Sequence, residues 1–521
     1  MDALADSLKV IADWITQHIT MWALIATGLF LTVVTRGVQV RHLPTMIRQV
    51  ASSRSGAAGG ISSFQAFAIS LAARVGVGNV FGVAAALLYG GPGAVFWMWV
   101  VALVGMATAF FEATLAQIFK VRAPDGSFRG GPAFYMARGM GGAGGRVMAG
   151  VFAVITLVTC GFIITSVQSN AVAGTLVAAL GGGEGSALPG FGGLSAAQLV
   201  VAGLVLVLTA VVVFGGIRAV ARVTEWMAPV MALIYIVLVA VVCLLNLGDF
   251  WRVIGRIISS AFAPEPLVGG LGGGVLAAVI NGTKRGLFSN EAGQGTAPNA
   301  AATATVAHPV QQGLIQSLGV FVDTIVVCTA TAFVILIAGP DTWTAPGANP
   351  STLTTLAIAH GLGGWTVLPM AVLIFVLAYS SIIAAYVYTD VNMDYLTGGR
   401  RWASWTVRVV SVASATAGAV LSLDVVWNAV DIAMAVMTLT NLVALIRLHR
   451  WGAGALRDYE DQLRAGAAEP VFRGRDNPRL PGDVPGGVWS SSDDDVTAAD
   501  ADDGSAPAPL AASPAPATTE E

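Results

Sequence analysis

Three charged side chains lie in a stretch that otherwise has the length and composition of a membrane span. Lys284, Arg285 and Glu291 fall within 281–300, NGTKRGLFSNEAGQGTAPNA, inside an apolar run near 270–305. Each would cost about 2.5–3.5 kcal/mol at the centre of a bilayer, so lipid is the wrong neighbour for them. The glycines of this stretch also interrupt regular helix, which membrane proteins tolerate only where protein or a water-filled cavity supplies hydrogen-bond partners. The stretch therefore predicts a binding site at membrane depth.

A second polar interruption occurs at 73–82, ARVGVGNVFG, which places Arg74, Asn79 and three glycines inside an apolar run. Broken helices leave unpaired N–H groups that suit a carboxylate, and unwound carbonyls that suit Na⁺ or an ammonium group. An amino-acid zwitterion together with a cation would match both. The alternative is that single glycines serve only close helix packing.

The composition identifies the class of protein. Of 521 residues, 55% are hydrophobic and only 11% are charged, against about 25% charged in soluble domains. We therefore expect an all-α polytopic membrane protein with about 11 transmembrane helices, at roughly 20 residues per crossing. The expected spans lie near 19–37, 62–90, 92–120, 147–180, 196–216, 224–246, 270–305, 310–339, 365–392, 403–422 and 425–449.

The order of these spans predicts an inverted repeat. If the first span is an accessory, the two interrupted spans are the first of five and the first of the next five, as expected for inverted repeats that bind a ligand between them. Basic residues after the first span predict a cytoplasmic linker, an outer N-terminus and a cytoplasmic C-terminus in the plasma membrane. The predicted organisation is 1–60, N-terminus, accessory helix and linker; 61–246, first repeat; 247–450, second repeat; 451–521, disordered acidic and Pro/Ala-rich tail.

Other functions have less support in the sequence. Five scattered histidines and three cysteines within apolar runs offer no metal-ligand spacing, disulfide framework or nucleophile with a base. We expect no enzyme activity, no covalent cofactor, no nucleic-acid partner and no obligate protein partner. A channel remains an alternative, although selectivity filters are usually assembled from repeated subunits around a symmetric pore.

Three long motifs resemble a known family. Residues 73–99 (ARVGVGNVFGVAAALLYGGPGAVFWMW), 128–135 (FRGGPAFY) and 283–324 are similar to the alanine or glycine:cation symporter family, the sodium:alanine symporters or amino-acid carrier proteins. The resemblance extends from about residue 15 to 450. It implies a leucine-transporter-type core of five plus five helices preceded by one extra helix. It also implies Na⁺-coupled or H⁺-coupled uptake of small neutral amino acids such as alanine.

The resemblance also assigns site residues. It implies that the backbone around Gly76 cradles the substrate carboxylate and that Phe162 covers the pocket. The Asn79 oxygen becomes a plausible Na⁺ ligand, with a helix-capping or interhelical amide as the alternative. The implied substrate-binding set is Gly76, Val77, Gly78, Asn79, Phe162, Gln168, Asn170, Gly293, Gln294, Gly295, Thr296, Ser381 and Ala385, and the implied Na⁺ set is Ala72, Val75, Asn79, Ser380 and Ser381.

The three charges of the first stretch receive a different role. Lys284, Arg285 and Glu291 are expected to form an internal ion pair or gate, with a contact between Glu291 and the substrate ammonium as the alternative. Proton coupling through Glu112, Glu291 or Asp323 remains open.

Departures from the family pattern bear on the substrate. Val77 stands where many members have Thr, Gln294 where Met is common, and Ala384–Ala385 where many have Gly-Trp. Loss of an indole opens space and Gln294 adds a polar group. A larger neutral amino acid such as glutamine is therefore the alternative substrate.

Overall fold

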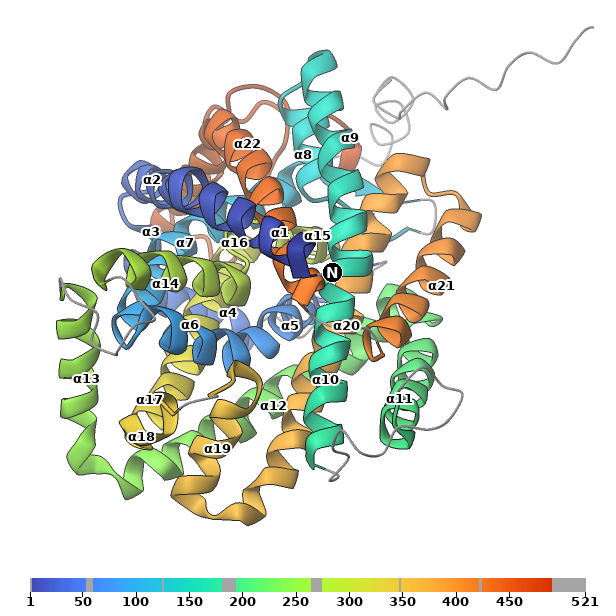
Figure 1. Ribbon diagram of the computed structural model, residues 1–521. Helices are drawn as coiled ribbons and strands as arrows, with labels where there is room; N and C mark the ends of the chain where they lie inside the picture. The colour runs from blue at the N-terminus through green and yellow to red at the C-terminus, as the bar shows by residue number, and fades with distance from the viewer. Residues whose placement is uncertain are drawn as a thin grey trace, which may run out of the picture.

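The computed structural model describes residues 2–52, 60–123, 126–179, 194–263, 274–345, 348–420 and 424–489. These residues are almost wholly helical, and their named strands form one antiparallel hairpin, β1 (Val121–Arg122) with β2 (Phe128–Arg129). Figure 1 shows the helices gathered into one bundle.

Apolar helices dominate the described residues. Eight are long and apolar enough to cross a membrane, and one bent pair would make a ninth. The remaining predicted spans, near 270–305 and 403–422, are a shorter helix of 17 residues and a more polar one of 18, so the total of about 11 stays a prediction. The apolar candidates are Val10–Val34, Gly93–Ile118, Gly142–Val177, Ala196–Val213, Gly216–Leu245, Pro309–Ile337, Gly364–Thr397 and Val430–Arg464, with Ser63–Arg74 plus Gly78–Gly90 as the bent pair.

The elements follow one another without long excursions. To residue 261 they are α1 (Asp2–Ile15), η1 (Thr16–Thr20), α2 (Met21–Val34), α3 (Val38–Arg41), α4 (Leu43–Ser52), α5 (Ser63–Arg74), η2 (Gly78–Gly82), α6 (Val83–Gly90), α7 (Gly93–Ile118), α8 (Pro132–Gly139), α9 (Gly142–Val158), η3 (Thr159–Ile164), α10 (Thr165–Ala179), α11 (Ala196–Val213), α12 (Gly216–Leu245) and α13 (Leu247–Ala261). From 274 they are α14 (Gly274–Asn290), α15 (Ala297–Ala301), α16 (Pro309–Val320), η4 (Phe321–Cys328), α17 (Thr329–Ile337), α18 (Pro340–Trp343), α19 (Pro350–Leu362), η5 (Gly364–Thr366), α20 (Val367–Thr397), α21 (Arg401–Gly418), α22 (Asp424–Arg464) and η6 (Gly487–Trp489).

The first helix break lies between α5 and η2. A capping box starts α5, with the Ser62 hydroxyl accepting the Gln65 N–H at 3.1 Å. The helix ends at Arg74, and the chain bends by 45° before continuing as η2 and α6. Gly76 is required at the bend, because a Cβ there would lie 2.3 Å from the Ser381 hydroxyl oxygen.

The second break lies between α14 and α15. Three residues of the intervening turns have left-handed backbone: Glu291 at φ +56°, Gly293 at +85° and Gly295 at +86°. Glycine adopts this conformation freely, whereas a glutamate does so only when its surroundings hold it there. The helix therefore stops at Asn290 because two glycines permit the turn and neighbouring side chains fix it.

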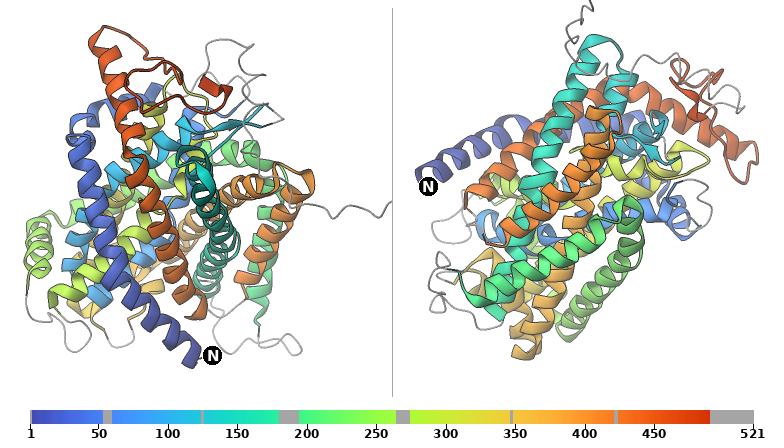
Figure 2. Two further views of the ribbon diagram at one scale, coloured as in Figure 1. Left: turned by 90° about the horizontal axis from the view of Figure 1, so that it is seen from above. Right: turned by 90° about the vertical axis from the view of Figure 1, so that its right-hand side faces the viewer.

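The two breaks are neighbours at the centre of the molecule. Helix α14 packs against η2, α6 and α7, while α15 packs against α5. Figure 1 shows α11 and α21 on one side of this centre and α13 on the other. Figure 2 shows α1 and α2 running along α22.

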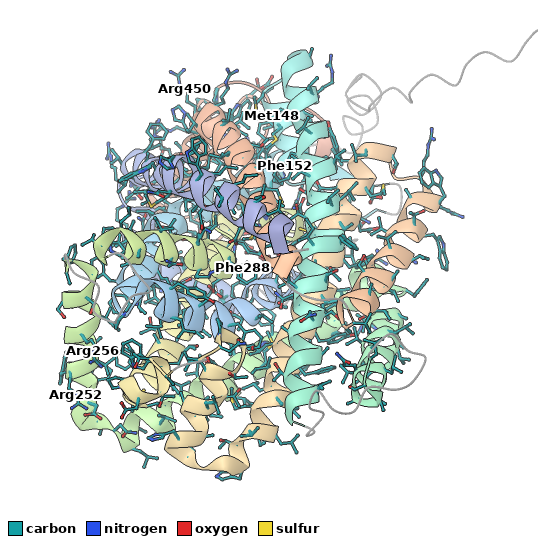
Figure 3. The ribbon with its side chains drawn as sticks, in the orientation of Figure 1. Met148, Phe152, Arg252, Arg256, Phe288 and Arg450 are labelled. Carbon is teal, nitrogen blue, oxygen red and sulfur yellow. The ribbon has the colours of Figure 1, made fainter. Side chains whose placement is uncertain are left out.

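Basic residues with opposite predicted sidedness lie at opposite ends of the structure. Figure 3 shows Arg450, predicted cytoplasmic, near the end of α22, and Arg252 and Arg256, predicted on an outer loop, on α13 far from it. Phe288 lies between these ends, close to the centre.

The prediction of a disordered tail from residue 451 is wrong for its first part. Residues 451–464 continue α22, and 465–489 pack against the body of the protein. The Phe472 N–H donates to the Ala307 carbonyl at 3.0 Å, and Trp489 donates its indole N–H to the Gln117 carbonyl at 3.1 Å. Composition missed this because a few buried aromatic anchors hold the segment. Residues 490–521 lie outside the described part.

Candidate substrate and ion site

Two adjacent serines of α20 meet the C-terminal end of α5. The Ser380 and Ser381 hydroxyls each donate to the Ala72 carbonyl at 3.0 Å, and Ser381 also reaches the Ala73 carbonyl at 3.1 Å. Val75 follows at the position where the backbone leaves the helix, with φ −77° and ψ 82°. Hydroxyl and carbonyl oxygens are the ligands that hard cations prefer. The structure therefore brings Ala72, Ser380 and Ser381 of the predicted Na⁺ set together beside the break.

Neutral amide side chains satisfy the backbone of the first break. The Gly76 N–H donates to the Asn79 side-chain oxygen at 2.9 Å, and the Val77 N–H donates to the Gln168 side-chain oxygen at 3.3 Å. Gly78 lies against Phe288 and Ser289, where a Cβ would stand 3.1 Å from each. The sites predicted around this break are thus adjacent in space.

Asn79 bridges the first break to η4. Its amide nitrogen donates to the Asp323 carboxylate at 2.7 Å and to the Asp323 carbonyl at 3.3 Å. Its oxygen accepts the Gly76 N–H, so both neighbours agree on the amide orientation. In this geometry Asn79 has the capping and interhelical contacts of the alternative interpretation.

Asp323 is a buried carboxylate with several donors. In addition to Asn79, the Ser289 and Thr324 hydroxyls each donate to it at 2.8 Å. Buried charge persists where it is paired or hydrogen-bonded. The cluster joins η2, α14 and η4, and it holds the two broken helices together.

A carboxylate from α7 satisfies the second break. The N–H groups of Gly293 and Gly295 donate to the two oxygens of Glu112 at 3.1 and 2.9 Å. The Asn441 amide of α22 donates to Glu112 at 2.5 Å and to the Gly293 carbonyl at 3.0 Å, and the Tyr135 hydroxyl donates to Asn441. Nearby N–H groups in left-handed turns form an anion-binding concavity. Here the protein's own carboxylate occupies it.

The predicted gate of Lys284, Arg285 and Glu291 is wrong in its partners. Lys284 pairs with Asp13 of α1 at 2.5 Å and with Asp431 of α22 at 3.3 Å, and Arg285 lies 3.5 Å from Asp431. Glu291 instead accepts the Thr296 hydroxyl at 2.8 Å. The two basic residues lie about two helical turns before Glu291, so the rise of α14 separates them from it.

Arg74 is a buried guanidinium at the first break. One nitrogen donates to the carbonyl and the side-chain oxygen of Gln316, both at 3.2 Å, while Nε and Nη2 have no hydrogen-bond partner among the described residues. It lies within electrostatic range of Glu112, Glu291 and Asp323. Gly319 leaves the room it needs, because a Cβ there would be 2.3 Å from Arg74 Nη1. Arg74 therefore balances the carboxylates around both breaks.

Gln294 has no partner for its side-chain amide. It is 1% exposed, and neither its oxygen nor its nitrogen makes a hydrogen bond to another described residue. An unsatisfied buried polar group costs about 1–3 kcal/mol. A ligand at the break would offer the missing partners.

Other predicted residues differ in position. Ala385 is buried on α20, and Asn170 is half-buried on α10. Phe162 is 46% exposed on η3, so its predicted role as a cover of the pocket is wrong. Its side chain points out of the helix bundle because it occupies the outer face of η3, a direction that a resemblance of sequence does not specify.

Several partners of the site were not predicted. Tyr388 lies 3.5 Å from Glu291, Asn441 bonds Glu112, and Gln316 bonds Arg74. Each is a polar residue within an apolar span, which is the signal that marks functional positions in membranes. That signal identifies the residues but not their partners.

Comparisons of sequence identify the family. The model of the sodium:alanine symporter family matches residues 1–474. The amino-acid carrier protein AlsT of Bacillus subtilis is 40% identical over 482 residues, covering 92% of this chain and 97% of AlsT. The probable sodium/glutamine symporter GlnT of Bacillus subtilis is 38% identical over 464 residues, covering 88% and 92%. The sodium/alanine symporter AgcS of Methanococcus maripaludis is 36% identical over 434 residues, covering 82% and 90%.

Comparison of structures supports the fold. The crystal structure of MhsT in complex with L-phenylalanine matches with a TM-score of 0.51 at 15% identity, covering 74% of this chain and 89% of MhsT. At that identity the likeness concerns the fold alone, which is similar to that of leucine-transporter-type carriers. With the family model spanning nearly the whole described chain, this polytopic membrane protein belongs to the sodium:alanine symporter family.

Proposed function

We propose that this protein imports a small neutral amino acid together with Na⁺ across the plasma membrane by alternating access. The observation that carries the proposal is the meeting of Ser380 and Ser381 with the Ala72 carbonyl at the end of α5. Three oxygens from two helices converge there, and a bound cation would join α5 to α20. Na⁺ binding would thereby order the break that receives the substrate.

The substrate would bind between the two breaks. The N–H groups at Gly76 and Val77 are held by the neutral amides of Asn79 and Gln168, which a carboxylate could replace. Unwound carbonyls would receive the ammonium group. Gln294 and Thr296 line the second break, and Gly78 and Gly82 leave space beside Phe288.

The finer architecture is part of this proposal. We assign α5–α6, α7, α9–α10, α11 and α12 to the first repeat, and α14–α15, α16–α17, α20, α21 and α22 to the second, with 1–60 as an accessory. The first helices of both repeats are broken and pack together, and the second helices, α7 and α16, also pack together. Pairwise contact between equivalent helices supports a two-fold relation. The N-terminus would be outside and the C-terminus cytoplasmic.

A second candidate substrate is glutamine. The unsatisfied amide of Gln294 favours a substrate with a polar side chain, because such a side chain would both donate to it and accept from it. The relative GlnT is named for sodium and glutamine, and AgcS for sodium and alanine. Competition of glutamine against alanine for uptake decides between the two.

Proton coupling is the alternative to Na⁺. It is favoured by three buried carboxylates, Glu112, Glu291 and Asp323, which surround the breaks. Uptake that follows a pH gradient and ignores Na⁺ would support it. Asp323→Asn would then abolish the response to pH.

Transport by purified protein in liposomes tests the proposal. Under an inward Na⁺ gradient we expect accumulation of alanine, glycine, serine or glutamine, and none of these with choline in place of Na⁺. Ser381→Ala removes one cation ligand, so the Na⁺ concentration for half-maximal uptake should rise about tenfold. Ser411→Ala, which removes a buried hydroxyl of α21, is the matched control and should leave it unchanged. Equal Na⁺ dependence in both variants would contradict the ion site.

A further inference from the structure

A cavity of about 470 Å³ opens where α2 ends beside α22, far in sequence from both helix breaks. Its volume is within the range of small-molecule sites, about 300–1,000 Å³. The lining residues at the end of α2 and in α3 are Val34, Thr35, Arg36 and Arg41, and those of α22 and the segment after it are Ala453, Leu456, Arg457, Glu460, Asp461, Arg464 and Arg479.

The charge of this cavity is strongly positive. Five arginines face two carboxylates, which leaves a net charge of three positive. Glu460 pairs with Arg41 and with Arg464 at 3.2 Å, and Asp461 pairs with Arg464 at 2.9 Å and with Arg479. The two carboxylates thus hold three of the arginines in fixed positions.

The other two arginines form no ion pair with a described residue. Arg36 and Arg457 lie on opposite walls, one at the end of α2 and one on α22. Arg36 has left-handed backbone, with φ +54°, directly after the last apolar residues of α2. Arginine is the side chain best suited to phosphate, because its planar group donates two parallel hydrogen bonds. The cavity therefore matches an anionic phosphate group.

The surroundings distinguish a lipid phosphate from a free one. Val34, the last residue of a candidate membrane span, lines the cavity, so the cavity lies at the end of the membrane-crossing part of α2. The preceding turns of α2 expose apolar side chains, with Leu29 51%, Phe30 38% and Val33 75% exposed. Acyl chains would cover these side chains when the phosphate occupies the arginines, whereas inorganic phosphate would leave them uncovered.

We propose that this cavity binds the phosphate group of an anionic phospholipid. The lipid would link the accessory helix α2 to α22 at one surface of the membrane. The site shares no residue with the substrate and ion site, so it stands independently of the proposed function.

The test measures lipid binding by the full-length protein. Native mass spectrometry would compare phosphatidylglycerol with phosphatidylcholine of the same acyl chains, with and without inorganic phosphate. Each basic residue near an anionic headgroup contributes about 1 kcal/mol, so Arg36→Gln with Arg457→Gln should weaken phosphatidylglycerol binding roughly 30-fold. Because neither arginine is ion-paired among the described residues, the thermal midpoint of the variant should remain that of the wild type.

The control changes the same charge elsewhere. Arg400→Gln with Arg401→Gln removes two exposed arginines between α20 and α21 and should leave phosphatidylglycerol binding unchanged. Equal loss in both double variants would overturn the proposal, as would equal binding of the two lipids by wild type. Full displacement of the lipid by millimolar inorganic phosphate would overturn the lipid assignment in favour of a free phosphate.

Discussion

The two helix breaks are satisfied by different chemistry. At the first, the N–H groups of Gly76 and Val77 meet the neutral amides of Asn79 and Gln168. At the second, the N–H groups of Gly293 and Gly295 meet the carboxylate of Glu112. Hydrogen bonds to an ionised acceptor are roughly twice as strong as neutral ones. The first break is therefore the exchangeable one, where a ligand can replace protein groups, and the second is the fixed one.

The largest expected effect is at the second break. Glu112→Ala leaves two backbone N–H groups and the Asn441 amide without their acceptor, and each hydrogen bond to a charged group contributes about 1.5–3 kcal/mol. We expect loss of monodisperse folded protein in detergent, measured by size-exclusion chromatography. Glu112→Gln retains one acceptor oxygen and should fold with a lowered thermal midpoint. If Glu112→Ala has the thermal midpoint of the wild type, the second break is not fixed by this carboxylate.

An exchange of side chains tests the link between the breaks. Asn79→Asp places a second carboxylate against Asp323, whose contact with the amide is 2.7 Å, and removes the donor. We expect a loss of stability of about 2–4 kcal/mol, within the range for broken buried polar pairs. Combining it with Asp323→Asn restores one donor and one acceptor, so the double variant should recover most of the thermal midpoint. A double variant no more stable than Asn79→Asp would show that the pairing is not what the substitution disrupts.

A smaller effect is expected at Gln168. Gln168→Leu removes the acceptor of the Val77 N–H, and hydrogen bonds between membrane helices average about 0.6 kcal/mol. The thermal midpoint should therefore change little, while affinity for substrate changes, since the freed N–H lies where a carboxylate would bind. Scintillation proximity binding of labelled alanine measures this. A stability loss as large as that of Glu112→Ala would remove the contrast between the breaks.

The smallest expected effect comes from a helix start outside both breaks. The His308 Nδ1 accepts the Val310 N–H at 3.2 Å, and its Nε2 lies 3.1 Å from Asp458. Burial lowers the pKa of His308 below its ordinary value of 6.5. The unfolded chain therefore binds a proton more readily than the folded one, so stability falls as the pH drops through this range.

The histidine can be replaced without losing the cap. His308→Asn keeps a side-chain acceptor at the start of α16 and cannot titrate. Between pH 7.5 and 5.5 we expect the thermal midpoint of the wild type to decrease by a few degrees more than that of His308→Asn. Parallel decreases in both proteins would exclude His308 as the titrating group.

Much of the site could be identified from residue types alone. The charges and glycines at 73–82 and 281–300 marked both breaks, because polar and flexible residues in apolar spans need a reason to be there. Glu112 and Asp323 were noted for the same reason. The pairing of Lys284 with Asp13 and Asp431 could not be predicted, because those partners lie 271 and 147 residues away in sequence.

Two other errors have the same physical origin. Phe162 was assigned to the pocket by resemblance, but the orientation of η3 turns it outward. The segment 465–489 has the composition of a disordered tail, yet Phe472 and Trp489 find sites on the folded body. Composition reports what a segment can bury alone, whereas here the remainder of the protein supplies the apolar surface.

The amino-acid sequence by itself determined the class of protein, the two interrupted helices and the family, because hydrophobicity, helix-breaking glycines and long motifs are local properties. The tertiary structure decided which groups satisfy the breaks. Neutral amides at one and a carboxylate at the other follow from how α7, α10 and η4 pack around the centre. Hydrogen-bond partners in a membrane come from neighbouring helices, and only packing brings those helices together.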